Sequence, residues 1–110
     1  IEEINLSTNV ESIGEYAFYS SAIDTIFLPK NIKDIKNNAF YMCHFDTVFY
    51  EGTLEEFNNV SVGNNNEDLI NKILYYSETE PTTEGNYWHY VDGVPTPWQE
   101  QAPEETPEEP

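Results

Sequence analysis

The residues best suited to catalysis in this chain are three adjacent pairs of carboxylates, which are Glu2-Glu3, Glu55-Glu56 and Glu67-Asp68. Acid–base catalysis needs two carboxyl groups that face one pocket, in environments that separate their pKa values. Adjacent residues on exposed turns meet neither condition. We therefore interpret these pairs as solvated surface and predict that the domain is not an enzyme.

The best candidate for a metal site is the polar run Asn64-Asn-Asn-Glu-Asp68. Its side chains offer the hard oxygen ligands that Ca²⁺ prefers, but their spacing lacks the alternation of a dedicated calcium loop. The favoured interpretation is a turn in which Asn66 caps the following helix. Calcium binding stays an open alternative, and no cofactor is predicted.

The single cysteine and the two histidines do not form a predicted site. Cys43 and His44 are adjacent, so they cannot both point inward, and neither His44 nor His89 has a second His or Cys at ligand spacing. Cys43 occupies the position that Ser21 holds in the preceding repeat. We predict that it is a small buried core residue.

Charge excludes one class of partner and constrains the rest. The formal net charge is −17, from 21 acidic residues against four lysines. Nucleic-acid binding requires clustered cations, so it is excluded. No apolar run approaches the length of a membrane-spanning helix, so membrane insertion is not expected. A protein partner should carry basic groups.

The elements that position these side chains come from a repeat of 22 residues. Residues 1–22 and 23–44 are identical at eight positions, and the pattern starts again at Phe45. Such a period predicts a solenoid in which each coil packs on its neighbours. We expect about two and a third repeats over residues 1–51, with parallel strands stacked in register and every recurring residue in the core. Phe18 and Phe40 should stack there, nearly fully buried.

After the repeats, residues 52–98 are predicted to form a capping repeat and an aromatic hairpin. Thr53 and Glu56 form a capping box for a helix, and residues 73–76 form a strand. Asp92-Gly93 lies between two apolar runs, which is a strong hairpin signal. Residues 99–110 hold only Glu, Gln, Pro, Ala and Thr and are predicted to be a disordered tail or linker.

The aligned copies resemble the BspA-like leucine-rich repeat family of bacterial surface proteins. The residues that carry the resemblance are Ile23, Ile26, Leu28, Pro29, Ile32, Ile35, Ala39, Phe40 and Cys43, with Ile13, Gly14, Ala17 and Phe18 in the first copy. The resemblance implies a leucine-rich-repeat solenoid of short stacked parallel strands with tight helical turns. A small C-terminal α+β cap with a β-hairpin would close it.

The same resemblance implies a protein that is secreted or displayed on the bacterial cell surface and binds host proteins or other cells. It supplies no catalytic residues. We therefore predict a protein-binding, adhesion-type scaffold whose partner is a host or cell-surface protein with a basic, apolar patch. A purely structural C-terminal cap and a cell-wall or glycan-binding hairpin are the alternatives, followed by a hydrolase-associated calcium-binding segment.

The first predicted binding surface consists of outward positions on the strands, which are Asn5, Thr25, Phe27, Thr47 and Phe49. Two exposed phenylalanines in line would mark an interaction surface, unless the cap or another chain covers them. The second choice is the hairpin, where Trp88, Tyr90 and Trp98 suit quaternary ammonium groups or sugars. The strand at the first repeat, with Ile1, Ile4 and Leu6, is expected to support self-association.

Overall fold

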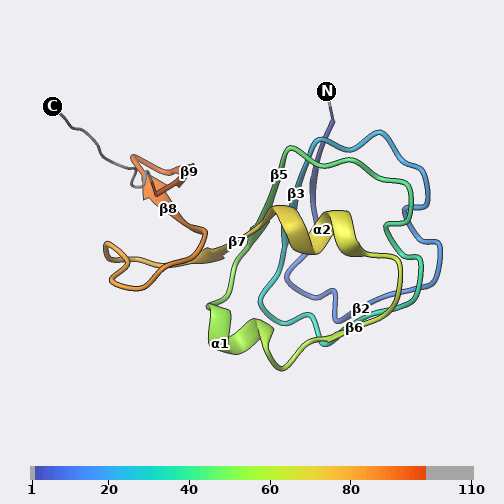
Figure 1. The fold of residues 1–110 in the computed structure, drawn as a ribbon. Helices are drawn as coiled ribbons and strands as arrows, with labels where there is room; N and C mark the ends of the chain where they lie inside the picture. The colour runs from blue at the N-terminus through green and yellow to red at the C-terminus, as the bar shows by residue number, and fades with distance from the viewer. Residues whose placement is uncertain (1, 99–110) are drawn as a thin grey trace, which may run out of the picture.

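The computed structural model describes residues 2–98, which wind through three coils of a solenoid and end in a hairpin (Figure 1). We define the first coil as residues 2–22, the second as 23–44 and the third as 45–72. The long sheet contains β1 (Glu3–Asn5), β3 (Thr25–Leu28), β5 (Thr47–Tyr50), β7 (Ile73–Tyr76), β8 (Tyr87–Val91) and β9 (Val94–Pro97), side by side in that order. All of its pairs are parallel except β8–β9.

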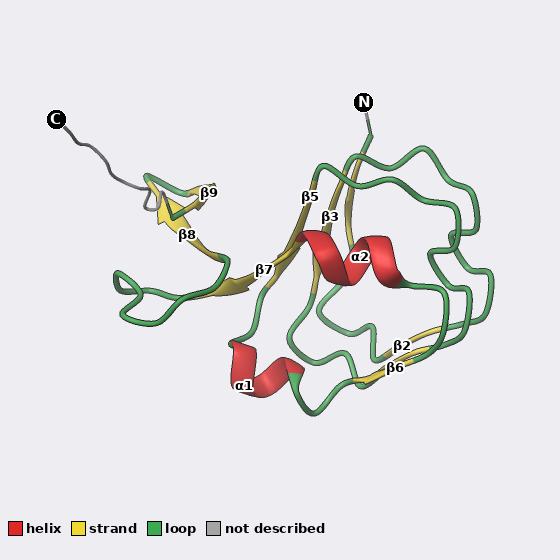
Figure 2. Cartoon of the chain, in the orientation of Figure 1, coloured by secondary structure: helices red, strands yellow, loops and turns green. Residues whose placement is uncertain are grey.

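A second, smaller sheet runs along another side of the coils (Figure 2). It pairs β2 (Ser12–Ile13), β4 (Asp34–Ile35) and β6 (Ser61–Val62) in parallel. The described residues contain two helices, α1 (Leu54–Phe57) and α2 (Glu67–Lys72), both in the third coil. The bends of the first two coils are turns, so the prediction of tight helical turns is wrong there.

The register follows the repeat. Ile4 pairs with Ile26 and Ile26 with Val48, at the predicted spacing of 22 residues. Because side chains alternate along a strand, this register directs Ile26 and Val48 into the core, where both are fully buried. The third coil is longer, since Val48 pairs with Ile73 and Asp34 with Ser61, and it accommodates α1.

The predicted capping box at the start of α1 is confirmed, with both of its hydrogen bonds present. The Glu56 backbone N–H donates to the Thr53 hydroxyl at 3.2 Å, and the Thr53 N–H donates to the Glu56 carboxylate at 2.8 Å. Cys43 is buried as predicted, with its Sγ donating to the Phe18 carbonyl. Burial raises the pKa of this thiol above its ordinary value.

The polar run at the start of α2 has a different role from the one predicted. The Asn66 side chain does not cap the helix. It is buried, and its Oδ1 accepts the Phe40 N–H at 2.9 Å while its Nδ2 donates to the Lys36 carbonyl at 3.0 Å. In the previous coil the equivalent Phe18 N–H donates to a backbone carbonyl, that of Ala39. The side chain of Asn66 therefore replaces the missing backbone acceptor where α2 begins.

The hairpin is confirmed. Asp92 and Gly93 both have positive φ, 53° and 80°, as the two central residues of a type I′ hairpin turn require. Residues 99–110, the predicted tail, lie outside the described residues, as does Ile1. The strand β1 lies at one edge of the long sheet, and self-association through it stays a prediction. No helix among residues 2–98 is long and apolar enough to cross a membrane.

Phe18 and Phe40 stack as predicted, with ring centroids 5.2 Å apart and planes 2° from parallel. Phe40 is buried, but Phe18 is only half-buried, because a neighbouring coil covers it on one side alone. We expect Phe40→Ala to lower the free energy of unfolding by about 3–5 kcal/mol and Phe18→Ala by less. Chemical denaturation of the two variants measures this order, and equal losses would contradict it.

Replacing Asn66 with Ala would leave the buried Phe40 N–H without an acceptor. We expect Asn66→Ala to lower the free energy of unfolding by about 1–3 kcal/mol, the usual cost of an unsatisfied buried donor. Asn64→Ala is the matched control, because the Asn64 side chain is exposed, and should change stability by less than about 0.5 kcal/mol. Equal melting temperatures for the two variants would show that the Asn66 bonds contribute nothing.

Candidate binding surfaces

The outer face of the long sheet holds an aromatic stack that the hairpin covers. Phe27 and Phe49 stack with centroids 4.8 Å apart, and Trp88 packs edge-to-face on Phe49 at 5.0 Å. Phe27 and Phe49 are only 6% and 7% exposed. The prediction of an exposed apolar patch at these residues is therefore wrong, and the alternative, that the cap covers them, is what the structure shows.

Trp88 covers the stack because of where β8 joins the sheet. The strand β8 pairs in parallel with β7, which places Trp88 beside Tyr76 on the same outer face as Phe49. Trp88 is fully buried, and its Nε1 donates to the Tyr50 carbonyl at 2.7 Å. This bond satisfies the only polar group of the indole inside the cluster.

The remaining predicted sheet-face residues are polar. Asn5 is exposed, while Thr25 and Thr47 are half-buried and pair with each other across β3 and β5. Phe27 and Phe49, the apolar residues predicted to lie open beside them, are covered. A binding role for Asn5, Thr25 and Thr47 stays a prediction.

The three predicted hairpin aromatics do not share one surface. Trp88 and Tyr90 lie on one face of β8, with centroids 5.0 Å apart. Trp98 stacks on His89, at 3.5 Å and 10°, and its Nε1 donates to the Ser77 carbonyl. His89 lies between Trp88 and Tyr90 in the strand, so alternation directs it to the opposite face.

A hollow of about 320 Å³ opens between the hairpin and the solenoid, and we call it the hairpin hollow. Its lining residues are Thr8, Lys30, Asn31, Glu51, Tyr76, Trp88 and Tyr90. They come from all three coils, from β7 and from the hairpin. Three of the hollows among residues 2–98 are larger. Two of them, of about 440 and 460 Å³, are lined mostly by the single loop of residues 77–86, and the third, of about 520 Å³, is lined by residues of the three coils between Glu11 and Val60. The hairpin hollow brings together the most distant parts of the sequence.

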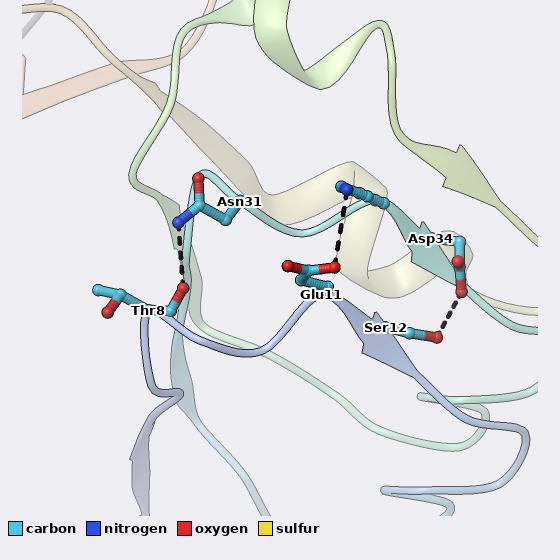
Figure 3. A network of polar contacts seen from close by, with 6 residues as sticks. Thr8, Glu11, Ser12, Asn31 and Asp34 are labelled. Atoms are coloured by element: carbon cyan, nitrogen blue, oxygen red, sulfur yellow. Dashed lines mark hydrogen bonds and ion pairs between the residues drawn. The ribbon is translucent and has the colours of Figure 1, made fainter.

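The solenoid wall of the hairpin hollow is held by bonds between coils. The Asn31 Nδ2 donates to the Thr8 carbonyl at 3.1 Å (Figure 3), and the Tyr50 hydroxyl donates to the Lys30 carbonyl at 3.4 Å. Beyond Asn31, the same seam continues with the Lys33–Glu11 ion pair and with the Ser12 hydroxyl, which donates to Asp34 at 2.6 Å.

Two groups in the hairpin hollow have perturbed acidity. Burial raises the pKa of the Glu51 carboxyl above its ordinary value. The pKa of the Tyr90 hydroxyl is also raised, first by burial and then by the negative charge of Glu51 and by Tyr76. Glu51, Tyr76 and Tyr90 all line the hairpin hollow, and the negative charge of Glu51 there disfavours ionisation of the Tyr90 hydroxyl.

A second surface, which the sequence reasoning missed, lies on the turns of the first two coils. Tyr16, Tyr19, Tyr41 and Met42 are 55%, 49%, 42% and 53% exposed. The ring of Tyr19 lies 5.6 Å from Tyr16 and 5.9 Å from Tyr41, measured between centroids. We call these four residues the tyrosine patch. The expectation that every recurring residue is in the core is wrong, because Tyr19 and Tyr41 recur and are exposed.

The backbone under the tyrosine patch is strained. Tyr16 and Met42 have φ of 63° and 67°, a left-handed conformation that bulky residues adopt at a cost. The equivalent positions in the other coil, Asn38 and Ser20, have φ of 64° and 55°. The coil thus demands a left-handed residue at both turn positions, and of these four residues only Asn38 is of a type that adopts this conformation readily. The recurrence of Tyr19 and Tyr41 outside the apolar pattern was the available sequence signal.

Two of the paired carboxylates, Glu56 and Asp68, have structural roles, and so do two asparagines of the calcium candidate. Glu56 caps α1, and a carboxylate oxygen of Asp68 accepts the Phe45 N–H at 2.7 Å. Asn65 donates to the Asn38 side chain, and Asn66 serves the Phe40 N–H. Among residues 2–98, no group of three or more His, Cys, Asp or Glu is placed to hold a metal ion.

Comparison with known proteins agrees with this architecture. Residues 1–78 match the family described as BspA type leucine rich repeat region (6 copies), and the chain belongs to that family. The family is typically non-catalytic and is generally associated with protein binding at surfaces. No curated protein and no solved structure matches the chain.

The raised pKa of Glu51 predicts a specific dependence of stability on pH. The folded state binds this proton more tightly than the unfolded chain, so ionising Glu51 as the pH rises lowers the free energy of unfolding. We expect Glu51→Gln to remove that loss. The stability of the variant relative to the parent should then grow between about pH 4, near the ordinary carboxyl pKa, and pH 7.

Denaturation at several pH values measures this difference. Glu80→Gln is the matched control, because Glu80 is exposed in a loop and reports only the removal of one negative charge. If the free energy of unfolding of Glu51→Gln changes with pH in parallel with that of Glu80→Gln, the burial of the Glu51 carboxylate is contradicted.

Proposed function

We propose that this domain is a non-catalytic, surface-displayed module that binds a protein partner, and that the tyrosine patch is the contact surface. The observation that carries the proposal is the exposure of four large apolar side chains together, on consecutive coils, at turn positions where two of them are strained. Membership of the BspA-type family supports a surface location and a binding role.

The residue types of the tyrosine patch favour a protein partner. Tyr and Met are enriched in protein–protein interfaces, and Tyr supplies a large share of interface hot spots. Tyr16, Tyr19 and Tyr41 form a chain of ring contacts, so their rings hold one another in place before any partner arrives. A surface ordered in advance loses little conformational entropy on binding.

The cost of the turn argues in the same direction. A bulky residue in the left-handed region costs about 1–3 kcal/mol, and the equivalent positions show that Asn or Ser can occupy this turn. Tyr16 and Met42 therefore do not serve the stability of the turn itself. A purely structural cap would not require large apolar side chains at these places.

Charge defines the partner further. The chain has a net charge of −17, and exposed Glu15 is next to Tyr16 in the chain. Of the four lysines, Lys33 and Lys36 pair with acidic residues and Lys72 donates to the Phe45 carbonyl. The partner that fits is a protein with an apolar centre and a basic rim, since charge complementarity speeds encounter and rejects acidic proteins.

The proposal is tested with the double variant Tyr19→Ser, Tyr41→Ser. Binding of the fluorescently labelled domain to cultured host cells and to purified basic extracellular proteins is measured at low and at physiological salt. We expect saturable binding by the parent that weakens as salt rises. The double variant should lose at least about tenfold in affinity, because each removed hot spot is worth roughly 1 kcal/mol or more.

The matched control is Val91→Ser, Val94→Ser, which removes two equally exposed apolar side chains from the hairpin. It should bind like the parent, and both variants should keep the parent's melting temperature. Equal binding by the tyrosine variant and the parent would place the contact surface elsewhere. Absence of binding by the parent to every probe would favour the structural cap.

A further inference from the structure

The hairpin hollow has the form of a small composite ligand site. Thr8 comes from the first coil, Lys30 and Asn31 from the second, Glu51 from the third, and Tyr76 and Tyr90 from the two strands that follow. Ligand sites in proteins typically measure about 300–1,000 Å³. At about 320 Å³ the hollow is at the small end of this range, with room for one compact ring.

One wall of the hollow is aromatic and rigid. Tyr76 and Tyr90 both pack edge-to-face on Trp88, at 5.2 and 5.0 Å and at 69° in each case. Trp88 has no exposed surface and is anchored to the Tyr50 carbonyl, so it acts as the support for the two tyrosines. Tyr90 is 50% exposed and therefore offers a fixed apolar ring face to a ligand.

The remaining wall of the hollow is polar and carries both signs of charge. Glu51 offers only acceptors and Lys30 only donors, whereas the Thr8 hydroxyl offers both. The amide nitrogen of Asn31 is engaged with the Thr8 carbonyl, which leaves the Asn31 Oδ1 as an acceptor. Lys30 would repel a cation and Glu51 an anion. The wall therefore suits a neutral ligand that has hydroxyl groups able to donate and to accept.

The Glu51 carboxylate is the group in the hollow that would gain most from a ligand with a donating hydroxyl. It is half-buried, and within residues 2–98 its oxygens accept no hydrogen bond and pair with no cation. A half-buried carboxylate without a partner costs free energy that a donating hydroxyl would recover. The raised pKa of this carboxyl has burial as its cause, with no cation lowering it.

From this combination we propose that the hairpin hollow binds one sugar ring of a neutral glycan. The apolar C–H face of the ring lies against Tyr90, and its hydroxyl groups bond to Glu51, Lys30 and Asn31. This site lies at the hairpin, is separate from the tyrosine patch and does not depend on the protein-binding proposal. A host glycoprotein and a bacterial cell-wall polysaccharide both offer the same chemistry.

The test is binding of the purified domain to a glycan array that carries neutral host oligosaccharides and neutral cell-wall polysaccharide fragments. Saturation-transfer NMR on the best glycan then measures affinity for four chains, which are the parent, Tyr90→Ala, Glu51→Gln and Val94→Ala. We expect at least a tenfold loss for Tyr90→Ala and a smaller loss for Glu51→Gln. Val94→Ala, at an exposed apolar residue of the same hairpin outside the hollow, should bind like the parent.

Tyr90→Phe is the control for a structural effect of the Tyr90→Ala substitution. It keeps the aromatic ring on Trp88 and should retain most of the affinity for the glycan. The class of glycan bound on the array, host or cell-wall, identifies the source of the ligand. The proposal is overturned if no neutral glycan binds the parent, or if Tyr90→Ala binds as well as the parent. Binding of tetramethylammonium or inorganic phosphate at this site in preference to glycans would also overturn it.

Discussion

Each coil of this solenoid can bury its apolar side chains only against the coils beside it, and the rest of the structure follows from that constraint. Ile26 and Leu28 are fully buried because coils lie on both sides of them. Residues 73–98, which follow the third coil, do not repeat the 22-residue pattern, so other elements cover this coil. The helix α2 places Leu69 in the core, and the hairpin places Trp88 on the outer face of the sheet. Two separate clusters are thereby closed, one inside the coils and one outside the long sheet.

The same constraint explains which parts of the fold could be predicted from the sequence. The register of Ile4, Ile26 and Val48 depends on the period alone, and the capping box of Thr53 and Glu56 depends on local chemistry alone. The position of Trp88 depends on which strand edge the hairpin joins, and no local pattern encodes that choice. Asn66 shows the same limit, since its partner, the Phe40 N–H, lies 26 residues earlier in the chain.

The candidate sites were less predictable than the fold for a related reason. Phe27 and Phe49 have the alternation of outward residues, but alternation identifies a face of the sheet without saying what covers it. Tyr19 and Tyr41 recur like core residues, yet their turn directs them to solvent. The hairpin hollow joins Thr8 to Tyr90, and only the wound chain brings such distant residues together. Period and alternation therefore identify the scaffold better than the surfaces built on it.

The turn that displays the tyrosine patch has a consequence for recognition at longer range. Backbone bonds between coils set its geometry, with the Phe18 N–H donating to the Ala39 carbonyl and the Ser20 N–H to the Tyr41 carbonyl, both at 2.8 Å. Neighbouring coils are thus held at nearly the strand spacing of about 4.8 Å. Side chains on equivalent turns form a row with fixed intervals, whatever their identity. A partner that contacts two turns at once gains avidity only if its own groups match that interval, so distance itself becomes a determinant of specificity.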